Sequence, residues 1–235
     1  MINILAVSDE EVLRDKEITF PRIDLLLGCG DLSPGYMEFL IDRYRPPGRI
    51  MTHGNHDDIY FQDSEPVNME YSRLYCGMFT ITEGIHTISK DDLPESERDL
   101  HLAAYSGACA YGDRPFYFSE NDAASWIRNL KWKDFFGNVR MDIMISHTPP
   151  ALEGVPYIDF FHRPSKNLAQ ICERFSPSLW FYGHIHSTYT DKPLDFYYED
   201  TQTHLLNASP FKFIQYDESS QKSHIPEYDW NNIYF

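Results

Sequence analysis

Six residues with metal-binding side chains are spread along the 235-residue chain, and most of them directly follow a short apolar run. They are Asp9, Asp31, Asn55, His147, His184 and His186. Carboxylate and amide oxygens combined with neutral imidazoles form a ligand set that suits Mn²⁺, Zn²⁺ or iron better than Ca²⁺. Six ligands are too many for one catalytic ion that also binds water, so we divide them between two divalent ions that share a bridging carboxylate. Two such ions can clamp the attacking and leaving oxygens of a phosphoryl displacement.

Each of these motifs alone also has an ordinary structural explanation. Asp9 and Gly30-Asp31 are common residues at turns, and a lone His-x-His pair such as His184 and His186 is often structural. The run Gly54-Asn55-His56-Asp57 is more specific, because an imidazole, an amide and a carboxylate rarely coincide in a simple turn. The joint occurrence favours a site, since the separate explanations would all have to hold at once.

The elements that must position these residues are short strands. Five continuous apolar runs are typical of strands buried on both faces of a sheet. The expected strands are Ile2–Val7, Ile23–Leu27, Arg49–Thr52, Met141–Ile145 and Leu179–Tyr182. In an open parallel sheet, loops and ligands meet at the carboxyl ends of the strands. We therefore expect the metal-type residues to gather at that edge.

Helical periodicity and later strands complete an α/β pattern. Ala123–Phe136 is predicted to be a helix capped by Ser119 or Asn121, and Lys166–Phe175 a helix capped by Ser165. The segment from Lys90 to Asp99 is charged and is expected to be an exposed loop. Further strands are expected at Met78–Ile88, Leu100–Tyr105, Phe196–Tyr198, His204–Asn207 and Phe211–Tyr216.

Length, charge and cysteine use limit the class of protein. A chain of 235 residues fits a single α/β domain over residues 1–235. The net charge of -16 disfavours nucleic acid as a partner and favours a small phosphorylated substrate. The 4 cysteines form no C-x-x-C pair, and Met1–Val7 is predicted to be a strand and not a signal peptide. With no apolar run long enough to span a bilayer, we expect a cytoplasmic protein with no membrane partner.

The order of the motifs from near residue 1 to about residue 186 resembles the calcineurin-like metallophosphoesterases. That resemblance implies a four-layer α/β/β/α sandwich of two mixed sheets flanked by helices, with the metal site at the C-terminal strand ends. It also implies a role for each motif residue. Asp9 and His186 would bind the first metal, Asp31 would bridge, Asn55, His147 and His184 would bind the second metal, His56 would contact the phosphate and the leaving oxygen, and Asp57 would orient His56.

One position departs from the family pattern. The first family motif is Asp-x-His, and here it reads Asp9-Glu10-Glu11, so Glu11 stands where a metal-binding histidine is expected. Two outcomes are open. Glu11 could coordinate the first metal and favour a harder ion such as Mn²⁺, or it could point to solvent while water fills the gap, which would loosen the first metal. We favour the second outcome.

The predicted function is hydrolysis of a phosphate mono- or diester by in-line attack of a metal-bridging hydroxide, with Mn, Fe or Zn as the two divalent ions. Asn55 and His56 would bind the substrate, and His56 would act as general acid. Two alternatives are a degenerate scaffold of the same fold that binds a protein partner, and a mononuclear hydrolase that keeps only the second metal. Weaker candidates for the pocket wall are His162-Arg163, Arg114 and Tyr117.

Overall fold

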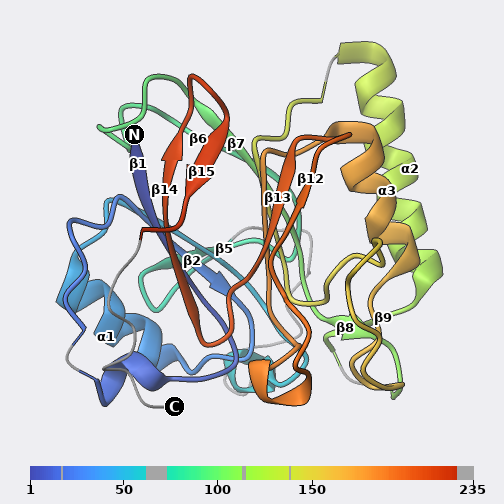
Figure 1. The fold of residues 1–235 in the computed structure, drawn as a ribbon, viewed down its shortest axis with the longest axis horizontal. Helices are drawn as coiled ribbons and strands as arrows, with labels where there is room; N and C mark the ends of the chain where they lie inside the picture. The colour runs from blue at the N-terminus through green and yellow to red at the C-terminus, as the bar shows by residue number, and fades with distance from the viewer. Residues whose placement is uncertain (17, 62–72, 113–114, 138, 227–235) are drawn as a thin grey trace.

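Two mixed β-sheets pack face to face, and helices cover the outer face of each sheet (Figure 1). The computed structural model describes residues 1–16, 18–61, 73–112, 115–137 and 139–226. Helix α1 (Pro34–Tyr44) lies against one sheet, whereas α2 (Glu120–Gly137) and α3 (Lys166–Phe175) lie against the other. The expected four-layer α/β/β/α sandwich is confirmed.

The first sheet has seven strands in the order β15-β14-β1-β2-β3-β5-β4. Its strands are β1 (Ile2–Val7), β2 (Leu25–Cys29), β3 (Gly48–Thr52), β4 (Arg73–Tyr75), β5 (Met78–Thr80), β14 (Phe211–Asp217) and β15 (Lys222–His224). Strands β1, β2, β3 and β5 run parallel, so the carboxyl ends of β1, β2 and β3 meet at one edge. A 3-10 turn, η1 (Val12–Arg14), follows β1, and another, η2 (Asp57–Phe61), follows β3.

The second sheet has six strands in the order β12-β13-β11-β10-β7-β6. Its strands are β6 (Glu83–Ile88), β7 (Leu100–Tyr105), β10 (Ile143–Ser146), β11 (Leu179–Tyr182), β12 (Phe196–Tyr198) and β13 (Thr203–Asn207). Strands β7, β10, β11 and β13 run parallel. A small separate pair, β8 (Ala108–Cys109) and β9 (Tyr117–Phe118), precedes α2, and the turn η3 (Ser187–Tyr189) follows β11.

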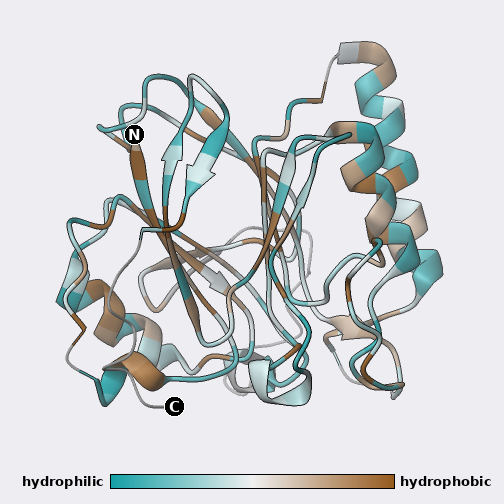
Figure 2. Cartoon of the chain, in the orientation of Figure 1, coloured by the Kyte–Doolittle hydropathy of each residue, from teal (hydrophilic) through white to brown (hydrophobic). Residues whose placement is uncertain are grey.

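Apolar side chains fill the three spaces between the four layers. Residues such as Leu27 and Ile143 fill the space between the sheets, and Trp180 lies between the second sheet and its helices. Tyr36 and Phe213 belong to the cluster that joins α1 to the first sheet. Figure 2 shows apolar residues along the inner strands and a mixture of hydrophilic and apolar residues along the helices. Burial of both strand faces explains the continuous apolar runs in the sequence.

Several element boundaries match the sequence prediction. Strands β1, β7, β11 and β12 begin and end where expected, and α3 begins after Ser165, whose hydroxyl accepts a hydrogen bond from the Leu168 N–H. Ser119 also caps α2, because its hydroxyl accepts from the Asp122 N–H while the Asp122 carboxylate accepts from Ser119. Both helices therefore follow the side-chain capping rule that the sequence analysis used.

The expected strand Met78–Ile88 is wrong as a single element. It is two strands, β5 and β6, which belong to different sheets. Between them, the Ile81 N–H donates to Met51 in the first sheet, and Thr82 accepts from Ser106 beside the second. Ile81 itself is buried in the core between the sheets. Because the crossing residues, Ile81 and Thr82, are both β-branched and favour strands, strand propensity did not reveal the change of sheet.

Two other features differ from expectation. Helix α1 was not predicted, although Ser33 caps it and Pro34 occupies its first turn, an arrangement that is common at helix starts. The loop from Lys90 to Asp99 is not wholly exposed, since Leu93 is fully buried between the sheets. In the described part of the chain, no helix has the length and apolar character needed to cross a membrane.

Candidate metal centre

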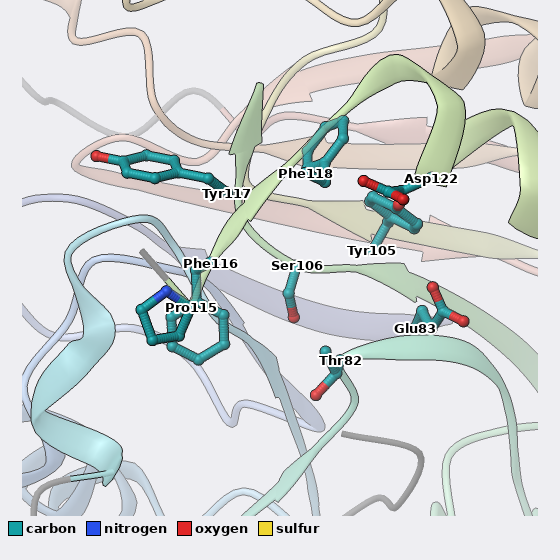
Figure 3. A pocket seen from close by; sticks show the side chains of 9 residues that line it. All are labelled: Thr82, Glu83, Tyr105, Ser106, Pro115, Phe116, Tyr117, Phe118 and Asp122. Carbon is teal, nitrogen blue, oxygen red and sulfur yellow. The ribbon is translucent and has the colours of Figure 1, made fainter. Parts of the chain in front are cut away.

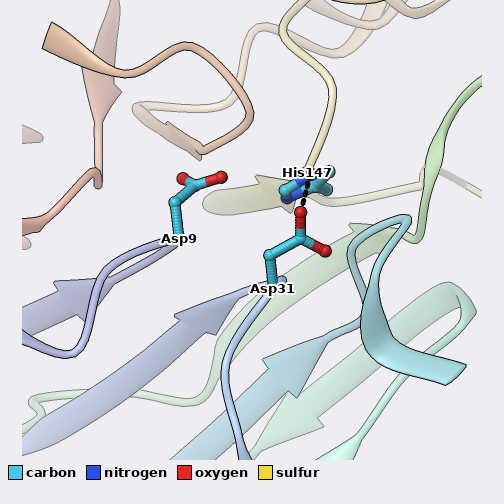
Figure 4. Close-up of side chains that lie close together, drawn as sticks. All are labelled: Asp9, Asp31 and His147. Atoms are coloured by element: carbon cyan, nitrogen blue, oxygen red, sulfur yellow. Dashed lines mark ion pairs between the residues drawn. The ribbon is translucent and has the colours of Figure 1, made fainter. Parts of the chain in front are cut away.

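The carboxyl ends of the parallel strands of both sheets lie close together, and the predicted ligands gather there. Asp9 follows β1, Asp31 follows β2 and His147 follows β10. One potential ligand atom from each of the three lies within 4.8 Å of the other two (Figure 4). Residues more than a hundred positions apart in the sequence therefore face one small space, as the strand-end argument predicted.

His147 is the centre of one half of the site. The ring is fully buried, and its Nδ1 lies 2.8 Å from the Cys29 carbonyl, which can only accept, so Nδ1 carries a proton. The other nitrogen, Nε2, lies 3.2 Å from Asp31 Oδ2 and 3.1 Å from Asn55 Oδ1. Two oxygens and an imidazole nitrogen thus converge, and a cation at this point satisfies all three.

His184 borders the same half. Its Nε2 lies 2.9 Å from the Phe161 carbonyl and must donate to it, which leaves Nδ1 with a free lone pair. The rings of His184 and His147 have centroids 4.8 Å apart. Burial, and then the charge of His147, lower the pKa of His184 to about 3, so the ring is neutral and able to coordinate.

Asp9 and His186 form the other half. Asp9 is held by the backbone N–H of His184, which lies 3.1 Å from each carboxylate oxygen. His186 Nε2 lies 3.7 Å from Asp9 Oδ1, and its Nδ1 lies 3.0 Å from Glu10 Oε1. Because Nδ1 donates to Glu10, the Nε2 lone pair points toward Asp9. Glu10, which the sequence analysis passed over, therefore sets the tautomer and orientation of His186.

Glu11 is turned away from this half. Its Oε1 accepts a hydrogen bond of 3.0 Å from the Ser33 N–H, next to the start of α1, and its Oε2 lies 3.5 Å from Arg14. Both carboxylate oxygens are thus engaged outside the site. Glu11 therefore matches neither outcome fully, because it contacts Ser33 and Arg14 and does not point freely to solvent, and no contact in the structure supports its possible coordination of a metal.

His56 and Asp57 occupy the loop after β3. The His56 side chain is exposed, and its backbone N–H donates to Asp31 Oδ1 at 2.7 Å. The Asp57 carboxylate is buried and accepts from the N–H groups of Asp31, Leu32 and Gly54. Asp57 was expected to orient the His56 ring, but these contacts show a different role. It fastens the β2 and β3 loops together and so positions His56 through the backbone.

Two motif glycines are required by close approach between loops. A Cβ on Gly54 would overlap the Asp31 carboxylate and backbone nitrogen, and a Cβ on Gly183 would overlap the Ser8 hydroxyl and approach Asp9. Each glycine thus makes room for a ligand delivered by a neighbouring strand. Asp9, Asp31 and His184 themselves have positive φ angles of 65°, 56° and 67°. Asp and His tolerate this left-handed region better than most residues.

The charges of the centre depend on one ion pair. Burial raises the pKa of Asp31, but the charge and hydrogen bond of His147 outweigh that effect and lower it to about 2. Burial likewise lowers the pKa of His147, while Asp31 and then Asp9 raise it to about 9. Burial raises the pKa of Asp9. Without metal, an imidazolium proton on His147 therefore compensates the Asp31 carboxylate.

These contacts fit divalent metal ions. Three imidazoles have one ring nitrogen fixed by an acceptor, and in His147 and His186 the other nitrogen faces carboxylate or amide oxygens, the arrangement that is usual for metal-binding histidines. Asp31, Asn55, His147 and His184 would hold one ion, and Asp9 and His186 would contribute to another, with Asp31 between them. The set contains no thiolate, since the Cys29 side chain is buried in the core between the sheets.

The weaker candidates for the pocket wall that the structure describes differ in how close they lie to the predicted metal ligands. His162 packs on His184, with ring centroids 5.0 Å apart. Arg163 is committed elsewhere, since it donates to the carbonyls of Phe160 and Ala110. Tyr117 lines the cavity shown in Figure 3 and packs on Tyr111, whose hydroxyl accepts from the Asn55 amide at 3.2 Å. Arg114 lies outside the described residues.

A separate cavity of about 420 Å³ lies between the start of β6, the end of β7 and the segment that contains β9 (Figure 3). Its wall includes Ser106, whose hydroxyl contacts Thr52 and the His53 N–H. Tyr105 and Phe116 supply aromatic surface. The lining contains none of the predicted metal ligands, so this cavity is distinct from the metal centre.

Comparison with known proteins identifies relatives. A family model described as calcineurin-like phosphoesterase matches residues 7–188. The crystal structure of TT1561 of Thermus thermophilus aligns with a TM-score of 0.57 and 13% identity, over 95% of this chain and 97% of that one. A putative 5'-nucleotidase from Staphylococcus aureus, in complex with alpha-ketoglutarate, aligns with a TM-score of 0.49 and 12% identity, over 93% of this chain and 51% of the other. No curated protein matches the chain.

The close approach at Gly54 yields a first prediction. Gly54→Ala places a methyl group on the Asp31 carboxylate, so we expect metal affinity to fall by about 10- to 100-fold, as for other residues that position metal ligands. The measurement is titration of metal-free protein with Mn²⁺ by calorimetry. Gly137→Ala is the matched control, because nothing lies within 4 Å of a Cβ there. Equal affinities of Gly54→Ala and wild type would contradict the interlocked-loop model.

The ion pair yields a second prediction. A metal must displace the proton of His147, whose pKa is about 9 in the metal-free protein. Affinity is therefore expected to rise between pH 6 and pH 8.5, by up to about tenfold per pH unit, with release of about one proton. Calorimetric titrations at pH 7 in two buffers of different ionisation enthalpy count the protons released. Metal binding without proton release is the result that opposes this assignment.

Proposed function

Because this chain belongs to the calcineurin-like phosphoesterase family, we propose that it is a cytoplasmic, metal-dependent phosphoesterase acting on a phosphate mono- or diester of a small molecule. The observation that carries the proposal is the convergence of Asp31, Asn55 and His147 at about hydrogen-bond distance, with the Nδ1–H of His147 fixed on a backbone carbonyl. A structural histidine needs no such set of oxygens around its second nitrogen.

Two divalent ions, of Mn, Fe or Zn, are proposed as cofactors. When bound, such ions supply a water activated for nucleophilic attack and neutralise charge on the phosphate. The protein residues hold this centre in shape. Asp31 lies between the two halves, and Glu10 holds His186 toward Asp9. His184 presents a neutral nitrogen, and His147 would do so once a metal has displaced its proton.

His56 and Asn55 are proposed to act on the substrate. The His56 ring is exposed at the centre while its backbone is tied to Asp31, so the imidazole can reach the leaving oxygen and donate a proton to it. The Asn55 amide has its nitrogen fixed by Tyr111 and its oxygen directed at His147. This fixed orientation suits an amide that stabilises charge on the phosphate oxygens.

Two specific observations bear on the alternatives. The engagement of Glu11 with Ser33 and Arg14 favours a weaker first metal, and hence a mononuclear enzyme as the runner-up. The scaffold alternative is favoured by an exposed cluster on α2, where Trp132, Phe135 and Phe136 are 61%, 77% and 78% exposed and contact one another. Such a patch is typical of an interaction surface, yet it is compatible with hydrolysis.

Metal analysis coupled to an activity assay separates these possibilities. We expect two metal equivalents in the reconstituted protein, and hydrolysis of an aryl phosphate mono- or diester that a chelator removes and Mn²⁺ restores. One equivalent with activity would support the mononuclear enzyme. Protein that stays inactive and metal-free after reconstitution with Mn²⁺ would support the scaffold.

Replacement of the proposed bridging ligand tests the site directly. Asp31→Asn keeps a hydrogen-bond acceptor for the His56 N–H and a residue type that tolerates positive φ, so the fold should persist. Hydrolysis should fall by at least about 100-fold, because the charge that holds the ions is lost. The assay is performed with metal-loaded protein, with circular dichroism to verify folding. Asp91→Asn, at an exposed position, is the control, and near-normal activity of Asp31→Asn would reject the bridging role.

A further inference from the structure

A row of aromatic rings runs along one side of the metal centre, from Asn55 to His186. It consists of Tyr111, Phe161, His162 and Tyr189, and we refer to it as the aromatic arc. Each ring contacts a proposed metal ligand, either directly or through the neighbouring ring. None of these four side chains is a proposed metal ligand, so the exposed aromatic surface of the arc requires a separate explanation.

The first part of the arc lies beside the second-metal half. The Tyr111 hydroxyl accepts a hydrogen bond of 3.2 Å from Asn55, and the Tyr111 ring meets the Phe161 ring edge to face with centroids 5.0 Å apart. The Phe161 carbonyl accepts from His184 at 2.9 Å, which fixes the backbone of this residue next to the ligand. The Phe161 side chain is nevertheless 51% exposed. A rigidly held phenyl group is thus open to solvent at the centre.

The second part of the arc lies beside the first-metal half. The Tyr189 ring has its centroid 4.8 Å from His162 and 4.8 Å from His186, and the side chain is 43% exposed. His162 fills the space between Tyr189 and His184. Exposed aromatic surface therefore borders both halves of the site, where a substrate group attached to the reacting phosphate would extend.

The charges around the arc restrict the kind of group it can bind. The Arg163 guanidinium donates to the carbonyls of Phe160 and Ala110 and stacks on the Phe160 ring at 4.3 Å. His162 Nδ1 is paired with Asp159, and Glu10 adds a further acid beside His186. The whole chain carries a net charge of -16. A substrate with additional phosphates would be repelled, so the group on the arc should be uncharged.

We propose that the aromatic arc is a subsite for a planar, uncharged aromatic group carried by the alcohol portion of the phosphate ester. This inference rests on the proposed phosphoesterase function and deepens it by naming the substrate class. A nucleobase and a simple aryl ring share the required chemistry, because either presents a flat π surface to stack on Phe161 or Tyr189. An aliphatic phosphate ester offers no such surface.

Matched substrate pairs test the proposal in the metal-reconstituted protein. Adenosine 5'-monophosphate and ribose 5-phosphate share a primary leaving alcohol and differ by the base, while benzyl and butyl phosphate differ by a phenyl ring. We expect kcat/KM to be about tenfold higher for the aromatic member of at least one pair, which is the effect of one stacking contact. Preference in the first pair alone identifies a nucleobase, and preference in the benzyl pair identifies an aryl group.

Variants of the arc assign the preference to its rings. Phe161→Leu keeps the backbone carbonyl that holds His184, and Tyr189→Leu keeps apolar bulk, but both remove the π surface. The aromatic-to-aliphatic ratio of kcat/KM should fall toward one in each. Tyr197→Leu, at an exposed aromatic on the edge strand β12, is the control and should keep the wild-type ratio.

The outcomes separate the subsite from the function on which it rests. Equal hydrolysis of both members of each pair, or an unchanged ratio in both arc variants, overturns the subsite while the phosphoesterase function stands. Hydrolysis of no member of either pair, nor of the aryl phosphate esters used above, overturns the function and the subsite together.

Discussion

The contact between Asp31 and His147 joins the two sheets at the edge where all the chemistry is expected. Asp31 ends β2 of the first sheet and His147 ends β10 of the second, and they meet at 3.2 Å. The second ring nitrogen of His147 also bonds to Cys29, again on the first sheet. A buried ionised pair is costly unless its hydrogen bonds are satisfied. Here the Cys29 carbonyl and Asn55 contact His147, and the His56 N–H donates to Asp31, so these hydrogen bonds offset the cost of burying the pair.

The remaining ligands follow from how the loops around this pair interlock. Asp57 ties the β2 loop to the β3 loop, and the backbone of His184 ties the β11 loop to Asp9 on β1. Gly54 and Gly183 leave the space through which these side chains pass. Asp9, Asp31 and His184 have left-handed backbone conformations, which are unfavourable for residues other than glycine. Contacts in the surrounding structure must therefore stabilise them. The centre is therefore a property of five loops packed as a unit, and not of separate motifs.

The sequence predicted the part of this arrangement that depends on strand ends. Buried runs followed by Asp9, Asp31 or His147 are local patterns, and parallel strands bring their ends together whatever lies between. The sequence did not predict the split between β5 and β6, because change of sheet is decided by packing of Ile81. Nor did it predict contacts made by backbone carbonyls, such as that of Phe161, since these leave no residue-type signal. The role of Glu10 in orienting His186 was not predicted either, because the departure from the family pattern lies at the next residue, Glu11.

The position of the aromatic cluster on α2 determines where a bound partner would lie relative to the metal centre. Strand β1 starts at the top of Figure 1 and ends at the bottom, beside the metal centre, whereas the C-terminal end of α2 lies at the top. The cluster belongs to that end of the helix. A partner bound to the cluster would therefore contact the end of the molecule opposite to the metal centre. Binding at α2 and the chemistry proposed for the centre would involve separate surfaces.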